Sequence, residues 1–214
     1  MSPACQQRKS IALAPGVVDD DDVRMFVAVV PPDEALDDLD EFLDVRRAAA
    51  DFRWSAREQW HLTLGFFAEV RERRLDELVG GLERVAARRT VFATRILGGG
   101  AFPDAAGAKV LWAGVDAGDD LSRLARGVRG AANTAGVRVD GARFRPHVTL
   151  ARFGRPREVT RWVRVLDSYR GPEWEVSEIA LIESHLGEGP RRSPRYETVV
   201  TIPLGALTGG RLGW

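Results

Sequence analysis

The chain contains very little of several features that usually mark a class of protein. Its single cysteine, Cys5, excludes an internal disulfide and gives no thiol pair for a metal site. No apolar run approaches the roughly 18 residues that a membrane-spanning helix requires, so we expect no membrane segment. Residues 1–22 lack a sustained apolar stretch and end in a run of aspartates, unlike a signal peptide. These absences predict a cytoplasmic protein with a disordered extension over residues 1–22.

An excess of charge of either sign is also missing. Lysine and arginine together number 31, as do aspartate and glutamate, so the formal net charge is zero. Long nucleic acids are bound largely through phosphate neutralisation, which this balance does not indicate, although a local basic cleft is compatible with it. The length of 214 residues and the apolar fraction of 44% are sufficient for a real core in one or two compact units.

Histidine is rare as well, but two of the three copies stand in the same context. The two stretches are His61-Leu62-Thr63-Leu64 and His147-Val148-Thr149-Leu150. Alternate side chains of a β-strand share a face, so each His lies beside its Thr while the apolar residues face a core. A single His in an apolar strand is more often a hydrogen-bonded structural residue, and only the repetition favours a functional pair. His185, beside the Gly-rich turn 187–189, is either a surface-loop residue or a neighbour of the cleft.

Apolar periodicity predicts alternating strands and helices. Strands are expected at residues 25–30, 52–54, 60–67, 90–97, 109–115, 144–153, 174–184 and 196–203, the last two as a hairpin. Helices are expected from Asp33, as the N-terminal cap, to about residue 50, and then over 72–88, 119–135 and 159–166. Gly98-Gly99-Gly100 is expected to end the strand that precedes it.

This order is strand-helix-strand-helix-strand, repeated once, with one extra strand. The motif histidines lie 86 residues apart, and the same shift places Met25–Val29 on Leu111–Val115. A repeat of this size indicates two similar lobes related by a pseudo-twofold axis. Such an arrangement brings both motif strands to the cleft between the lobes.

Two imidazoles and two hydroxyls in one cleft suit acid–base chemistry on a phosphate, of which the hydrolysis of a cyclic phosphodiester is one case. Water attacks phosphorus in line with the departing oxygen, which requires a base on one side and an acid on the other. One neutral and one protonated His supply both near neutral pH, and the Thr hydroxyls can donate to the non-bridging oxygens. Arg152, five residues after His147, falls on the opposite face of a regular strand. It is therefore either a surface residue or a phosphate ligand brought round by a bend. No cluster of ligand spacing indicates a metal site.

The chain resembles the bacterial and archaeal RNA 2′,3′-cyclic phosphodiesterases, also called 2′-5′ RNA ligases, of the 2H phosphoesterase superfamily. The segments that carry the resemblance are Arg24–Val29 with Pro31, Trp60–Leu64, Phe102-Pro103 with Val110–Val115, Phe144–Arg152, and Glu183-Ser184 with Tyr196. The resemblance implies a single α+β, bilobal domain over residues 23–204, with an antiparallel sheet and outer helices in each lobe around a central cleft. Residues 205–214 are then a C-terminal tail. The N-terminal extension and the Arg-rich loop 191–195 are departures from the family pattern.

The resemblance also implies an activity. Family members open a terminal 2′,3′-cyclic phosphate to a 2′-phosphate, without a metal or other cofactor, on RNA ends or small nucleotides. By this resemblance His61 is the general acid that protonates the leaving 3′-oxygen, and His147 is the base that activates water. Thr63, Thr149 and Arg152 hold the phosphate, which requires the strand to bend or end at Arg152.

Two other functions stay open: 2′-5′ RNA ligation by the same site, and an RNA-binding module without turnover. The sequence alone does not assign the acid and base roles, the direction of the reaction or the physiological RNA. Because one chain holds every site residue, we expect a monomer.

Overall fold

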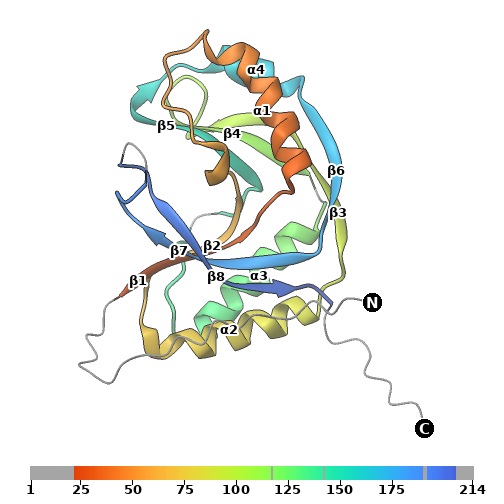
Figure 1. Ribbon diagram of the computed structural model, residues 1–214, viewed down its shortest axis with the longest axis vertical. Coiled ribbons are helices and arrows are strands. Elements are labelled where there is room, and N and C mark those ends of the chain that lie inside the picture. The colour runs from red at the N-terminus through yellow and green to blue at the C-terminus, as the bar shows by residue number, and fades with distance from the viewer. Residues whose placement is uncertain (1–21, 117, 142, 190–191, 206–214) are drawn as a thin grey trace.

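One antiparallel sheet of eight strands organises the protein. The computed structural model describes residues 22–116, 118–141, 143–189 and 192–205, and the expected N-terminal extension up to residue 21 and tail from residue 206 lie outside them (Figure 1). The elements in chain order are β1 (Val23–Val29), α1 (Asp33–Arg47), β2 (Leu62–Val70), α2 (Glu72–Ala87), β3 (Phe92–Phe102), β4 (Ala108–Asp116), α3 (Asp120–Thr134), β5 (His147–Arg157), α4 (Thr160–Asp167), β6 (Arg170–Val176), β7 (Glu178–His185) and β8 (Arg195–Pro203). A short 3₁₀ turn, Arg57–Gln59, precedes β2.

The sheet consists of two four-stranded lobes. Its strand order is β6-β3-β4-β5-β2-β1-β7-β8, and β2 and β5 are joined only through the pair Leu62 and Val148. We call β2, β1, β7 and β8 the first lobe, and β6, β3, β4 and β5 the second. The pairing of β1 with β2 matches that of β4 with β5, as the repeat predicts. The α+β class and the bilobal antiparallel arrangement are confirmed, with the two lobes sharing one curled sheet.

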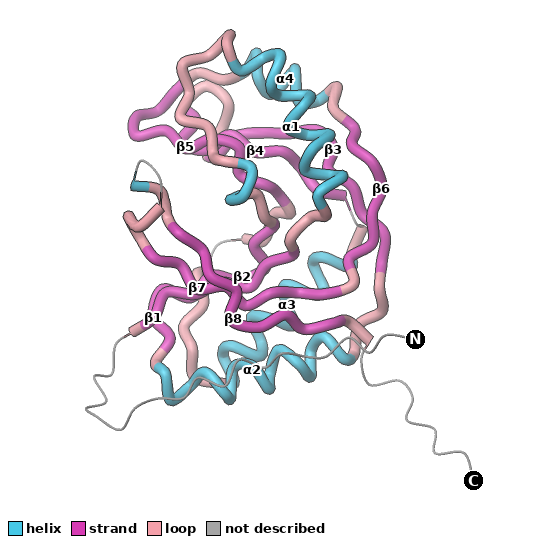
Figure 2. The backbone as a smooth tube through the Cα atoms, viewed as in Figure 1, coloured by secondary structure: helices cyan, strands magenta, loops and turns pink. Residues whose placement is uncertain are grey.

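The helices lie on the outside of this sheet, two on each lobe. Helices α2 and α3 pack together on the first lobe through β8 and β2, whereas α1 and α4 cover the second lobe through β6 and β3 (Figure 2). Each helix buries the apolar stripe that its periodicity predicts, such as Leu78 and Leu82 of α2 and Leu121 and Leu124 of α3. Because α1 follows β1 yet covers the other lobe, the chain crosses between the lobes and ties them together. None of the described helices is long and apolar enough to cross a membrane.

Four local predictions are wrong. Asp33 is the first residue of α1, and Pro32 holds the cap position without a side-chain hydrogen bond. Residues 52–54 form no strand, only a single bridge between Trp54 and Ala151. The expected strand 174–184 breaks at Ser177 into β6, which pairs with β3, and β7, which pairs with β1. There are therefore two strands beyond the repeat, β7 and β8, and these do form the expected hairpin.

The fourth wrong prediction concerns the three glycines 98–100, which lie inside β3 and do not end it. The pairing register of β3 shifts between Ile96 and Gly99, and Gly98 has a φ of +63°, a conformation that glycine adopts at little cost. At Gly100 a Cβ atom would lie 2.3 Å from the Trp112 ring. The glycines therefore allow a bulge and a close approach of an aromatic ring within a continuous strand.

Candidate active site

His61 immediately precedes β2 and packs against aromatic side chains of the first lobe. Its ring stacks on Phe26 of β1, with centroids 4.6 Å apart, and meets Tyr196 of β8 edge-on at 5.3 Å. The imidazole also donates a hydrogen bond to the backbone carbonyl of Gln59. These contacts fix the orientation of the ring and leave its other nitrogen available for chemistry.

His147 begins β5 and is held in the same way by the second lobe. Its Nδ1–H donates to the carbonyl of Arg145 at 2.7 Å, because a carbonyl can only accept, and Nε2 is left available. The ring meets Phe102 edge-on at 5.1 Å and lies 6.0 Å from Trp112. In both motifs the carbonyl partner is the residue two positions before the histidine, so the repeat extends to the orientation of the imidazoles.

The two histidines meet at the junction of the lobes. The pair that joins β2 to β5, Leu62 with Val148, consists of the residues that directly follow them. Burial, with smaller contributions from the positive charges of Arg152 and His147, lowers the pKa of His61 to about 4. Burial also lowers the pKa of His147, with smaller contributions from the charges of Arg152 and Arg145. In the ligand-free protein both imidazoles are therefore neutral at neutral pH.

Arg152 reaches this site because β5 contains a bulge. The register pairs along β5 and β4 are His147 with Gly114, Thr149 with Trp112, Ala151 with Leu111, and Arg152 with Val110. Leu150 is thus an extra residue, and beyond it the alternation of faces is reversed. Arg152 consequently shares the face of His147 and Thr149, which confirms the predicted break in the regular strand. No carboxylate among the described residues pairs with Arg152.

The first lobe repeats this bulge with a different side chain after it. Along β2 and β1, Thr63 pairs with Ala28, Gly65 with Val27, and Phe66 with Phe26, so Leu64 is the extra residue. Leu64 lies 86 positions before Leu150, and the position equivalent to Arg152 holds Phe66. The same backbone irregularity therefore presents an aromatic ring in the first lobe and a cation in the second.

The face that carries the histidines points away from the helices, and we call it the inner face. A Cβ atom on Gly65 would lie 3.0 Å from Val128 of α3, and Gly65 faces opposite to Thr63 and Phe66. In the second lobe, Gly99 approaches Leu166 of α4 on the side opposite to Trp112. The structure thus brings His61, His147, Thr63, Thr149 and Arg152 to the inner face. Neither Thr hydroxyl is hydrogen-bonded within the described residues.

Sequence reasoning assigned no role to several other residues of the inner face. The Arg24 guanidinium lies 4.4 Å above the Phe66 ring, and that of Arg145 lies 4.9 Å from the Trp112 ring. Tyr196 contacts both Phe26 and His61. Burial raises the pKa of its phenol, so the hydroxyl stays protonated, and the nearby charges of Arg152 and Arg24 oppose this shift. The resemblance included Arg24 and Tyr196, but no pattern in the sequence indicated what they do.

His185 lies elsewhere. It ends β7, and its neighbour across the hairpin, Arg195, precedes Tyr196, so the two aromatic side chains point to opposite faces. Its imidazole nitrogens lie 3.4 Å from Glu183, 3.8 Å from Glu197 and 3.9 Å from Glu188. His185 is therefore a strand residue among carboxylates, not a border of the histidine pair.

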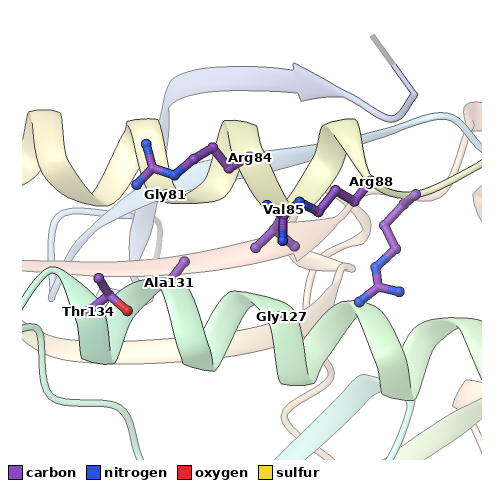
Figure 3. A pocket seen from close by; sticks show the side chains of 8 residues that line it. Gly81, Arg84, Val85, Arg88, Gly127, Ala131 and Thr134 are labelled. Carbon is purple, nitrogen blue, oxygen red and sulfur yellow. The ribbon is translucent and has the colours of Figure 1, made fainter. Parts of the chain in front are cut away.

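A separate hollow of about 280 Å³ lies between α2 and α3, on the outside of the first lobe (Figure 3). Its lining residues are Gly81, Arg84, Val85, Arg88, Arg89, Gly127, Ala131 and Thr134. The sheet separates it from the inner face, so it takes no part in the histidine site. In the described part of the chain, no three His, Cys, Asp or Glu side chains are placed to hold a metal ion.

Comparison with known proteins places the chain in a family. The chain is 33% identical to the RNA 2′,3′-cyclic phosphodiesterase of Aeropyrum pernix, over 72% of this chain and 86% of that one. It is 29% identical to the protein of that name from Geobacillus stearothermophilus, over 88% of this chain, which spans only 59% of that relative. The crystal structure of TT0787 of Thermus thermophilus matches with a TM-score of 0.69 at 30% identity, over 85% of this chain and 98% of that one. The model of the 2′-5′ RNA ligase superfamily matches residues 31–188, and the chain belongs to this superfamily.

Proposed function

We propose that this protein hydrolyses the 2′,3′-cyclic phosphodiester at RNA ends to a 2′-phosphate, by a two-histidine mechanism that needs no metal. The observation that carries the proposal is the meeting of two His-x-Thr motifs at the junction of the lobes, beside an arginine without a carboxylate partner. The relatives named RNA 2′,3′-cyclic phosphodiesterase support the substrate class.

The histidines divide the proton transfers. His147 Nε2 takes a proton from water as its oxygen bonds to phosphorus, and His61 gives its proton to the departing 3′-oxygen as that bond to phosphorus breaks. Both are neutral before the substrate binds, so His61 must gain a proton when the phosphodiester enters. The negative charge of the phosphate favours this, because an opposite charge close to an imidazole raises its pKa.

The phosphate itself is held by groups that have no competing hydrogen bond or ion pair within the described residues. The hydroxyls of Thr63 and Thr149 donate to the non-bridging oxygens, where charge accumulates in the transition state. The Arg152 guanidinium offers several N–H donors in one plane, which match phosphate oxygens. Its charge also offsets the negative charge that the substrate brings to a half-buried site.

The test is an assay of the purified chain, with EDTA present, on a short RNA that ends in a 2′,3′-cyclic phosphate. We expect conversion to a 2′-phosphate, lost in both His61→Ala and His147→Ala and kept in the control His185→Ala. A 3′-phosphate product, activity that EDTA abolishes, or turnover in either cleft-histidine variant would contradict the mechanism. RNA binding without turnover would identify a binding module instead, and joining of RNA ends without hydrolysis would identify a ligase.

We also propose that residues 23–204 form a single domain that acts as a monomer in the cytoplasm. One chain supplies every residue of the histidine site, and the crossing of α1 to the second lobe ties the lobes into one unit. Light scattering during size-exclusion chromatography tests the oligomeric state, and a mass of twice 23.6 kDa would contradict the proposal.

A further inference from the structure

Arg24 is a cation of the inner face that the proposed mechanism does not use. Within the described residues its guanidinium has neither an ion pair nor a hydrogen bond, and its one contact of this kind is the Phe66 ring at 4.4 Å. Other arginines of the chain do have carboxylate partners: Arg57, for example, pairs with Asp33 and Asp37. A guanidinium held over an aromatic ring and free of carboxylates is ready to bind an anion.

The position of Arg24 follows from the register of β1. Phe26 and Ala28 of this strand share the inner face, and Ala28 pairs with Thr63. Arg24 lies on the same face, four residues before Ala28, which is about 13 Å along a strand. The backbone of Arg24 is therefore displaced by this distance from Ala28 and its partner Thr63, a separation on the scale of one nucleoside.

An aromatic surface connects the two positions. Starting at His61, the ring of Phe26 is the first neighbour, Tyr196 meets Phe26 at 5.1 Å, and Phe66 follows in β2 beneath Arg24. Flat apolar rings with one protonated hydroxyl suit the ribose and base of a nucleotide. The phenol of Tyr196 is close enough to both Arg24 and Arg152 for their charges to act on it.

The second lobe also holds a guanidinium over a ring, Arg145 at 4.9 Å from Trp112, but its equivalent strand positions carry different side chains. The residue equivalent to Arg24 is Val110, and Arg152 stands where the first lobe has Phe66. Arg24 and Arg152 therefore extend from non-equivalent strands of the two lobes, and neither has an ion pair within the described residues. Along the inner face, Arg152 and the histidines come first, the aromatic surface follows, and Arg24 lies at its far end.

We propose that Arg24, supported by Phe66, binds the phosphate on the 5′ side of the terminal nucleotide while the cyclic phosphate occupies the histidine site. In an RNA chain this phosphate and the cyclic one are attached to the same ribose. The inference rests on the proposed function and narrows its substrate: the enzyme prefers ends that carry a 5′-linked phosphate to nucleoside 2′,3′-cyclic phosphates. Either a phosphodiester or a 5′-monophosphate supplies the required chemistry.

Three substrates separate these cases: uridine 2′,3′-cyclic phosphate, the same compound with a 5′-monophosphate, and the dinucleotide UpU with a 2′,3′-cyclic end. We expect the wild-type kcat/KM to be higher for the two phosphate-bearing substrates, by about tenfold for one charge-assisted contact. Preference for the dinucleotide alone would assign the contact to a phosphodiester. Equal rates on all three substrates would overturn the inference.

The variants test whether Arg24 causes the preference. In Arg24→Met the ratio of kcat/KM between phosphate-bearing and nucleoside substrates should fall about tenfold, and Arg24→Lys and Phe66→Leu should lose part of it. Arg84→Met removes the same charge from the outer hollow and should leave the ratio unchanged. An Arg24→Met variant that keeps the wild-type ratio would overturn the inference even if all substrates are hydrolysed.

A binding measurement keeps this test apart from that of the proposed function. A fluorescent UpU with a 2′-phosphate end and uridine 2′-phosphate compete for the site without any reaction. Tighter binding of the dinucleotide that Arg24→Met abolishes would uphold the subsite even if no substrate turned over. Equal affinities in both proteins would refute it whatever the activity.

Discussion

Acid should destabilise this protein through His61. The imidazole packs between Phe26 and Tyr196, and burial lowers its pKa in the folded protein from about 6.5 to about 4. In the unfolded chain the imidazole is exposed to water and its pKa returns to about 6.5. Between these two values the unfolded chain binds the proton more readily, so stability falls as the pH is lowered.

The size of the effect follows from the two pKa values. Above about pH 6.5 both states are neutral at His61 and the residue makes no pH-dependent contribution. At pH 4 the unfolded chain is almost fully protonated, whereas the folded protein is half protonated, which corresponds to a loss of about 3 kcal/mol. This is a large share of the 5–15 kcal/mol that is common for a domain.

Urea unfolding at pH 7, 5.5 and 4, in buffers without phosphate, measures this loss. Carboxylates also titrate in this range, so the informative quantity is the difference between the wild type and His61→Asn. Asparagine keeps an N–H donor for the Gln59 carbonyl but does not titrate, and the variant should lose about 3 kcal/mol less than the wild type between pH 7 and 4. Equal losses would refute the reasoning, because His61 would then bind protons equally well in both states.

Two further perturbations test the site and the sheet. Arg152→Met removes a cation that acts on both imidazoles, so the pKa values of His61 and His147 should rise in an NMR titration. The affinity for inorganic phosphate should fall about tenfold. The control Arg84→Met should leave both titrations unchanged, and unchanged titrations in Arg152→Met would place Arg152 outside the site. Gly100→Ala forces a Cβ atom against the Trp112 ring and should lower the free energy of unfolding by about 2 kcal/mol. The control Gly130→Ala, which has open space around it on α3, should not lower this free energy. Equal stabilities of the two variants would show that the Trp112 ring moves aside freely.

The two-lobed architecture was predictable because the sequence contains an internal repeat. The shared pattern of His61 and His147, at a spacing of 86 residues, predicted two lobes and placed the histidines at their junction. Helix periodicity predicted the four helices of the described part of the chain, since an amphipathic stripe depends on local spacing alone. Ser177 was missed for the opposite reason: the apolar residues on either side continue the strand pattern, and only tertiary pairing separates β6 from β7.

The position of Arg152 could not be predicted from the regular alternation of side chains along a strand. In a regular strand Arg152 would face away from His147 and Thr149, because successive side chains alternate between the two faces. The bulge at Leu150 places Arg152 on their face, and this bulge has only a weak signal in the sequence. That signal is a small residue directly after the bulged leucine: Ala151 follows Leu150 in β5, and Gly65 follows Leu64 in β2. Two consecutive residues then face the core, which a small side chain permits. Contacts such as Arg24 on Phe66 join residues far apart in the chain and have no local signature.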